Sequence, residues 1–207
     1  MLESSWVIVF AKAPEAGRVK TRLAAEIGDA EALRVYREMA ERQWEWLLAA
    51  RNTDGFHLGV SFAPAEAEPL IRAWLAGADA YLPQTDGNLG DRIANACDWA
   101  LDQGGRSVTV MGSDCPGFDH RHLQIGFAGI QNHSYSLGPA LDGGFYALTL
   151  TPQARPLLKR LPGIPWSSSQ TSASLIREAD SLDLAGLLLP ELRDLDTLAD
   201  LVFYQKE

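Results

Sequence analysis

The amino-acid sequence predicts an α/β fold in which a mostly parallel sheet lies between two layers of helices. The apolar run Trp6–Ala11 has no alternation, which is typical of a strand buried on both faces of a parallel sheet, and Ser107–Met111 predicts a second buried strand. Segments with helical periodicity follow these runs, so strands and helices alternate along the chain. Sheets of this kind have right-handed crossovers and bind ligands beyond the carboxyl ends of their strands.

The first half of the chain predicts three strands and three helices in alternation. Trp6–Ala11 begins the sheet, and Asp29–Ala50 repeats apolar residues at intervals of three and four, which predicts a helix. Phe56–Phe62 alternates as a second strand, and Pro64 can start the short helix after it. A brief extended piece at Ala80–Gln84 then leads through a glycine-rich loop into the third helix.

The second half continues the alternation with more turns. Ser107–Met111 is a clear buried strand, and a helix from Asp119 turns its apolar residues inward. Ser134–Gly138 is extended and meets another extended run across a Gly-Gly break. A run of serines can then cap a helix. An extended run precedes the final helix, for which Thr197 and Asp200 predict a capping box.

The bulk properties indicate one globular domain, 1–207. Of the 207 residues, 46% are hydrophobic and 22% charged, which suits a compact domain with a sizeable core. A formal net charge of −9 makes nucleic acid an unfavourable partner. The two cysteines lack metal-ligand spacing, so no structural zinc is expected. No apolar run approaches the ~20 residues of a membrane span, and we expect a cytoplasmic protein.

A basic loop, Phe10–Leu23, follows the first predicted strand. It holds four cations, and Gly17 among them lets the backbone turn close to a ligand. The cations are Lys12, Arg18, Lys20 and Arg22. Cations with exposed amides suit a di- or triphosphate, although their spacing matches neither of the two commonest phosphate-binding motifs. The alternative is a solvated basic turn ahead of a helix.

Three aspartates stand where they could hold a divalent cation. Asp114 follows the Ser107–Met111 strand, and a carboxylate there can bind an ion that also grips phosphate. Asp194 and Asp196 lie two apart in an extended segment, so their side chains point to the same face. The alternatives are an Asx turn or cap at Asp114, and capping of the final helix by Asp196 or Thr197.

Asp142 precedes two glycines between two predicted strands. The glycines permit a backbone bend that would bring a substrate hydroxyl near this carboxylate. A plain hairpin turn explains the Asp-Gly-Gly sequence equally well. Of the six tryptophans, Trp166 beside the serine run is a candidate for the rim of a pocket.

Six segments, taken in order, resemble the bacterial transferases of the DUF2064 family, within the GT-A or nucleotide-diphospho-sugar transferase superfamily. The similarity covers nearly the whole chain, and the superfamily includes MobA-like and CofC-like nucleotidyltransferases. The segments are Phe10–Ala24, Gln84–Arg92, Gly112–Phe118, Gly138–Leu148, Pro165–Ser169 and Asp194–Leu201.

The resemblance implies a three-layer α/β/α Rossmann-like GT-A fold with a nucleotide at the carboxyl ends of the first strands. It also implies Mg²⁺ or Mn²⁺ held by Asp114, with Asp194 or Asp196 completing the site. The expected nucleotide contacts are Lys12, Gly17, Arg18, Lys20, Arg22, Asn88 and Arg92. The expected catalytic residues are Asp114, Asp142 and Lys20, with Asp142 on the acceptor side.

Three functions are consistent with these residues. The first is metal-dependent transfer of a sugar from a nucleotide-activated donor to a small-molecule acceptor. The second is nucleotidyl transfer, in which an NTP joins a phosphorylated small molecule and pyrophosphate leaves. The third is a non-catalytic domain that binds nucleotides. The base, the sugar, the acceptor and the oligomeric state are not indicated by the sequence.

Overall fold

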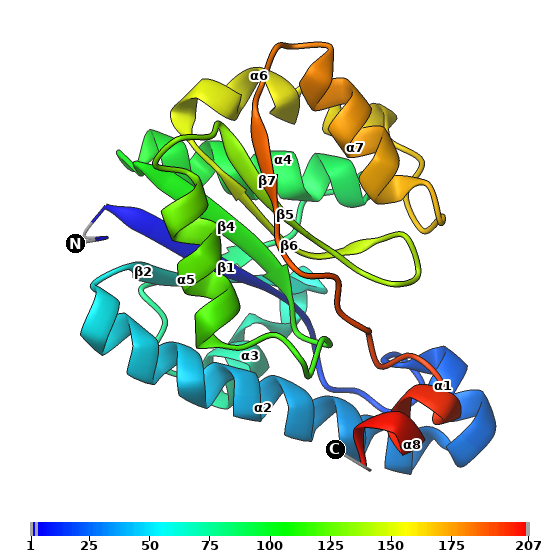
Figure 1. Ribbon diagram of the computed structural model, residues 1–207. Coiled ribbons are helices and arrows are strands. Elements are labelled where there is room, and N and C mark those ends of the chain that lie inside the picture. Colours follow the sequence, from blue (N-terminus) through cyan, green and yellow to red (C-terminus); the bar gives the residue numbers. More distant parts are fainter. Residues whose placement is uncertain (1, 3, 206–207) are drawn as a thin grey trace.

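The computed structural model describes residues 2 and 4–205, and in this part of the chain a seven-stranded sheet has the order β3-β2-β1-β4-β6-β5-β7 (Figure 1). The strands are β1 (Ser5–Lys12), β2 (His57–Ala63), β3 (Ala80–Pro83), β4 (Ser107–Gly112), β5 (Tyr135–Pro139), β6 (Phe145–Leu150) and β7 (Gly186–Leu188). The α-helices are α1 (Thr21–Ile27), α2 (Asp29–Asp54), α3 (Glu68–Trp74), α4 (Leu89–Asp102), α5 (His120–Gly129), α6 (Arg155–Leu158), α7 (Thr171–Asp180) and α8 (Leu198–Tyr204). Short 3-10 turns are η1 (Ala65–Ala67), η2 (Pro152–Ala154) and η3 (Leu161–Gly163).

The sheet is mostly parallel, as the sequence predicts. β1 pairs in parallel with β2 and with β4, β2 with β3, and β5 with β7. β6 alone breaks this pattern among the described strands, because it runs antiparallel to both β4 and β5. The reversal needs only the tight Asp-Gly-Gly turn between β5 and β6, whereas parallel neighbours require the long helical crossovers.

Helices cover both faces of the sheet and give the predicted three layers (Figure 1). α2, α3 and α5 pack on one face, and α4, α6 and α7 on the other. Val7 and Val9 of β1 belong to the first core, whereas Trp6 and Ile8 belong to the second. Both faces of β1 are buried, which explains its unbroken apolar sequence.

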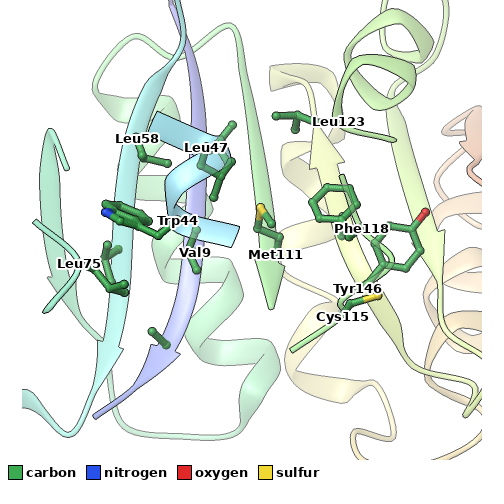
Figure 2. Packing of buried hydrophobic residues seen from close by; sticks show 14 of the residues in the cluster. Val9, Trp44, Leu47, Leu58, Leu75, Met111, Cys115, Phe118, Leu123 and Tyr146 are labelled. Carbon is green, nitrogen blue, oxygen red and sulfur yellow. The ribbon is translucent and has the colours of Figure 1, made fainter. Parts of the chain in front are cut away.

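The core under α2 and α5 also anchors the loop that follows β4. Figure 2 shows Trp44 and Leu47 of α2 beside Val9, and Phe118 beside Tyr146. The ring centroids of Phe118 and Tyr146 lie 5.1 Å apart. Because Phe118 is buried in this core, the loop between β4 and α5 is held at its far end.

A short helix, α1, replaces the second part of the predicted basic loop. That loop was expected to run to Leu23, but it ends at Lys20, and Thr21–Ile27 is helical. The reason is tertiary packing: Leu23 is fully buried in a third, small core with Val35 of α2 and Leu195.

Helix ends follow local capping in most but not all predicted cases. Thr197 and Asp200 form the predicted capping box of α8. α5 has Asp119 as its N-cap. The predicted serine cap of α7 is wrong, since its N-cap is Gln170 without a side-chain capping bond. No helix in residues 2 and 4–205 has both the length and the apolar character needed to cross a bilayer.

Candidate functional site

The candidate site lies where the neighbouring strands β1 and β4 end. Phe10 pairs with Gly112 in the parallel register, so the loops after both strands start side by side. A segment close to the C-terminus reaches the same edge, where the backbone N–H of Leu195 donates to the Asp114 carbonyl at 3.3 Å. Three distant parts of the sequence thus meet at one edge of the sheet, as expected for ligand sites of such folds.

Lys20 is the centre of this arrangement. Its ammonium Nζ donates to Asp114 Oδ2 at 3.0 Å and to Asp196 Oδ1 at 2.9 Å. The Lys20 side chain is only 4% exposed, and its backbone is left-handed, with φ 46° at the N-cap of α1. Arg22 adds a more exposed contact, in which Nη1 donates to Asp196 Oδ2 at 3.3 Å. Two cations therefore converge on two carboxylates.

Electrostatic attraction keeps Lys20 and Asp114 charged. Burial alone would lower the pKa of Lys20, but attraction to Asp114 and Asp196 outweighs it and raises that pKa above its ordinary value. The nearby Lys20 ammonium in turn holds the pKa of Asp114 below its usual range, against the opposing effect of burial. The Lys20–Asp114 contact is an ion pair at neutral pH.

Asp194 is different, because it has no hydrogen bond or ion pair within the described residues. Burial, reinforced by the negative charges of Asp114 and Asp142, raises the pKa of Asp194 to about 7. A carboxylate in this condition favours either a proton or a bound cation.

Two adjoining cavities of unlike charge open at this edge. One, which we call the cationic lobe, has a volume of about 520 Å³, and the other, the acidic lobe, about 470 Å³. The cations lining the cationic lobe are Lys12, Lys20, Arg22 and Arg92. The carboxylates lining the acidic lobe are Asp114, Asp142, Asp194 and Asp196, with Lys12, Phe145 and Trp166 beside them. Asp114 and Asp196 line both lobes, so the Lys20 ion pairs mark their boundary.

Arg92 of α4 also lines the cationic lobe. Its Nη1 donates to Gln84 Oε1 at 3.3 Å, while its Nε is buried without a partner in the described part of the chain. A guanidinium that is only partly satisfied next to a cavity suits an anionic ligand.

Asp142 lies in the turn between β5 and β6, at the mouth of the acidic lobe. Its Oδ1 accepts from the Gly144 backbone N–H at 2.7 Å. Gly143 has φ 88°, and a Cβ there would lie 2.2 Å from the Ser169 carbonyl oxygen, so this position requires glycine. The Ser172 N–H also donates to the Gly143 carbonyl at 2.9 Å, which ties the turn to α7.

Three residues predicted to contact the nucleotide lie outside both lobes. Arg18 is paired with Glu15 at 3.1 Å, and its side chain is 70% exposed. Gly17 is exposed and has φ 75°, which fits a turn. Asn88 caps α4, and its Nδ2 donates to the Pro162 carbonyl at 2.8 Å. Their contact with a nucleotide stays a prediction.

A family comparison identifies the chain from its central part. The model of a family described as "Uncharacterized protein conserved in bacteria (DUF2064)" matches residues 46–168, which is more than half of the chain. The chain belongs to the DUF2064 family. The resemblance seen in the sequence is confirmed. No curated protein matches the chain.

Solved structures confirm the fold of this DUF2064 chain. A "putative nucleotide-diphospho-sugar transferase" from Desulfovibrio desulfuricans G20 is 28% identical, with a TM-score of 0.88 over 99% of this chain and 87% of that one. 4-Diphosphocytidyl-2C-methyl-D-erythritol synthase from Anaerococcus prevotii is 9% identical, with a TM-score of 0.63 and 99% and 100% coverage. Rv0371c of Mycobacterium tuberculosis, in complex with manganese, is 14% identical, with a TM-score of 0.50 and 98% and 99% coverage. The last two share the fold alone.

The donor atoms of the site fit a divalent cation only in part. Between residues 4 and 205, no three Asp, Glu, His or Cys side chains form a group ready to hold a metal ion. Two of the candidate ligands, Asp114 and Asp196, are already paired with Lys20. The chemistry of the donors nevertheless suits Mg²⁺ or Mn²⁺, since the acidic lobe gathers carboxylates and Asp194 lacks a partner.

Two residues of the site escaped prediction from the sequence. Tyr36 lines the cationic lobe, where its hydroxyl accepts from the Lys12 N–H at 2.9 Å and donates to the Lys12 carbonyl at 3.0 Å. The apolar periodicity of Asp29–Ala50 includes Tyr36 and predicts a position in the core for it. Ser167 lines both lobes with a left-handed φ of 55°. The serine run after Trp166 was the only signal for it.

Proposed function

We propose that this DUF2064 protein is a metal-dependent transferase that takes a nucleotide-activated donor and passes a sugar to a small-molecule acceptor. The observation that supports this most is the Lys20 junction with Asp114 and Asp196, which separates a cationic from an acidic lobe. A donor diphosphate suits the first lobe, and an acceptor hydroxyl suits the second.

Each lobe has a role that follows from its charges. In the cationic lobe, Lys12, Arg22 and Arg92 bind and orient the donor phosphates. The Lys20 ammonium then neutralises charge that develops on the departing phosphate. In the acidic lobe, Asp142 accepts a proton from the acceptor hydroxyl, because its Oδ2 is not used by the Gly144 bond.

A divalent cation would add to this scheme through the chain's own carboxylates. Asp114, with Asp194 or Asp196, would hold Mg²⁺ or Mn²⁺, which supplies positive charge to the diphosphate. The manganese complex of the distant Rv0371c supports this choice only by fold.

Nucleotidyl transfer is the second candidate, and one observation favours it. The chain shares its fold, at a TM-score of 0.63, with a 4-diphosphocytidyl-2C-methyl-D-erythritol synthase. The acidic lobe argues for sugar transfer instead, because a phosphorylated acceptor would have to enter among four carboxylates.

Product analysis separates these functions. The protein is incubated with Mn²⁺, candidate acceptors and either nucleotide sugars or NTPs, and the released phosphates are identified. Sugar transfer releases a nucleoside diphosphate, whereas nucleotidyl transfer releases pyrophosphate. Tight nucleotide binding without either product would instead support a non-catalytic binding domain. Release that persists in Asp142→Asn at the wild-type rate would contradict the role given to Asp142.

A further inference from the structure

We propose that Lys20 is the resident counterion of the Asp114–Asp196 pair, and that a divalent cation binds this pair well only after a diphosphate has drawn the Lys20 ammonium away. This inference rests on the proposed function, since it requires a diphosphate in the cationic lobe. It goes further by assigning an order to binding, with the phosphate ligand preparing the site for the metal.

The geometry of Lys20 supplies the first argument. One ammonium spans both carboxylates, at 3.0 Å and 2.9 Å, and its side chain is 4% exposed. An ion coordinated by Asp114 or Asp196 would lie within about 5 Å of this ammonium, where two cations repel each other. The ammonium and the metal therefore compete for the same pair of carboxylates.

The position of Lys20 supplies the second argument. Lys20 lines the cationic lobe, where Lys12, Arg22 and Arg92 would surround a diphosphate. Its side chain has four rotatable bonds, so the ammonium can exchange a carboxylate for a phosphate oxygen without movement of the backbone. A diphosphate is the one expected ligand that offers Lys20 a replacement for two lost ion pairs.

The coupling is reciprocal. If a diphosphate improves the affinity for a divalent cation by some factor, the cation improves the affinity for the diphosphate by the same factor. The unpartnered Asp194 lies beside the pair in the acidic lobe and would add a ligand once Lys20 has left. In the free protein, the metal site is closed by the chain's own lysine.

Titration of the full chain with Mn²⁺, with free Mn²⁺ followed by electron paramagnetic resonance and no nucleotide present, tests this directly. The wild type is expected to bind Mn²⁺ weakly, and Lys20→Met at least about tenfold more tightly, a coupling of ordinary size. Lys20→Arg keeps the charge and should bind Mn²⁺ as weakly as the wild type does. Lys12→Met is the matched control, because Lys12 lines both lobes but makes no ion pair with these aspartates. A Lys20→Met protein that binds Mn²⁺ no more tightly than Lys12→Met overturns the proposal.

A second measurement uses the wild type, in case Lys20→Met does not fold. The ammonium signal of Lys20 is followed by ¹H–¹⁵N NMR, with inorganic pyrophosphate as the probe. We expect Mg²⁺ alone to leave the signal unchanged and pyrophosphate with Mg²⁺ to shift it. A shift with Mg²⁺ alone, or none with both, overturns the proposal. These readouts need no turnover, so an inactive protein with the expected Mn²⁺ affinities would remove the proposed function and leave the cation exchange standing.

Discussion

Lys20 and Asp196 are separated by 176 positions in the sequence, yet Lys20 Nζ lies 2.9 Å from Asp196 Oδ1. Packing beneath this contact holds the two segments together, since Leu23 of α1 and Leu195 share a buried core. The C-terminal segment therefore completes a site that the first loop begins. The Lys20 side chain is only 4% exposed, so its contact with the more exposed Asp196 depends on the position of both backbones.

The stability of the protein should depend on pH through Asp194. Its pKa is raised to about 7 in the folded state, so the fold binds a proton that the unfolded chain releases near its ordinary pKa of ~3.9. The stabilisation of the fold by this proton is present in full below about pH 4 and is lost as the pH rises towards 7. Over this pH range, the free energy of unfolding should decline by about 1–3 kcal/mol less in Asp194→Asn than in the wild type, allowing for solvent screening.

Urea unfolding at pH 5 and pH 8 checks the effect of Asp194. The decline in unfolding free energy between the two pH values should be smaller in Asp194→Asn than in the wild type. Asp180→Asn, at an exposed position at the end of α7, serves as the control and should keep the wild-type decline. Equal declines in all three proteins would contradict the environment assigned to Asp194.

Asp142→Asn should separate donor binding from turnover. Asparagine keeps the Oδ1 that accepts from Gly144, so the turn should persist while the basic oxygen is lost. We expect the donor affinity to change by less than about twofold and the turnover rate to fall by about 10² or more. Isothermal titration of the donor and a steady-state assay measure the two quantities. A parallel loss of both would show that Asp142 serves the structure of the site instead.

Arg92 and Arg18 are both basic, but only Arg92 lines the cationic lobe. Arg92→Met should weaken the binding of a nucleoside diphosphate by about tenfold, which corresponds to loss of one charge-assisted contact of ~1.4 kcal/mol. Arg18→Met tests the sequence prediction that Arg18 contacts the nucleotide. Because Arg18 and its partner Glu15 lie outside the lobes, we expect a change of less than about twofold. Equilibrium titration of both variants at one salt concentration makes the comparison. Equal losses would point to a general charge effect.

Gly90, at the start of α4, should not tolerate a side chain. A Cβ there would lie 2.2 Å from the Leu161 carbonyl oxygen and 2.6 Å from Trp166 Nε1. Gly90→Ala should lower the free energy of unfolding by about 3 kcal/mol through overpacking. Gly163→Ala, which meets nothing within 4 Å, should stay within about 0.5 kcal/mol of the wild type. Thermal and urea unfolding of both variants provide the measurement.

Local patterns in the sequence predicted most of the fold. The uninterrupted apolar run of β1 reflects burial on both faces, and the Thr197–Asp200 capping box depends only on residues three apart. The helix α1 was missed, because seven residues are too few for a periodic signal and tertiary packing of Leu23 stabilises them.

The site was predictable in its residue types but not in its contacts. Strand periodicity placed Asp194 and Asp196 on one face, and both do line the acidic lobe. The contacts of Lys20 with two aspartates could not be foreseen. They depend on how the C-terminal segment packs beside the loop that follows β1. The same holds for Tyr36, whose hydroxyl bonds to a backbone on another element.

The proposed function requires that this site bind a nucleoside diphosphate with the help of a divalent cation. Thermal unfolding with nucleoside diphosphates and nucleotide sugars, each with and without Mn²⁺, tests it most directly. A ligand at about 100 times its dissociation constant should stabilise the wild type by ~2.7 kcal/mol, or roughly 5–10 °C, and Asp114→Ala should lose the part that depends on Mn²⁺. No shift with any nucleotide, or a Mn²⁺-dependent shift that Asp114→Ala retains in full, would contradict nucleotide and metal binding at this site.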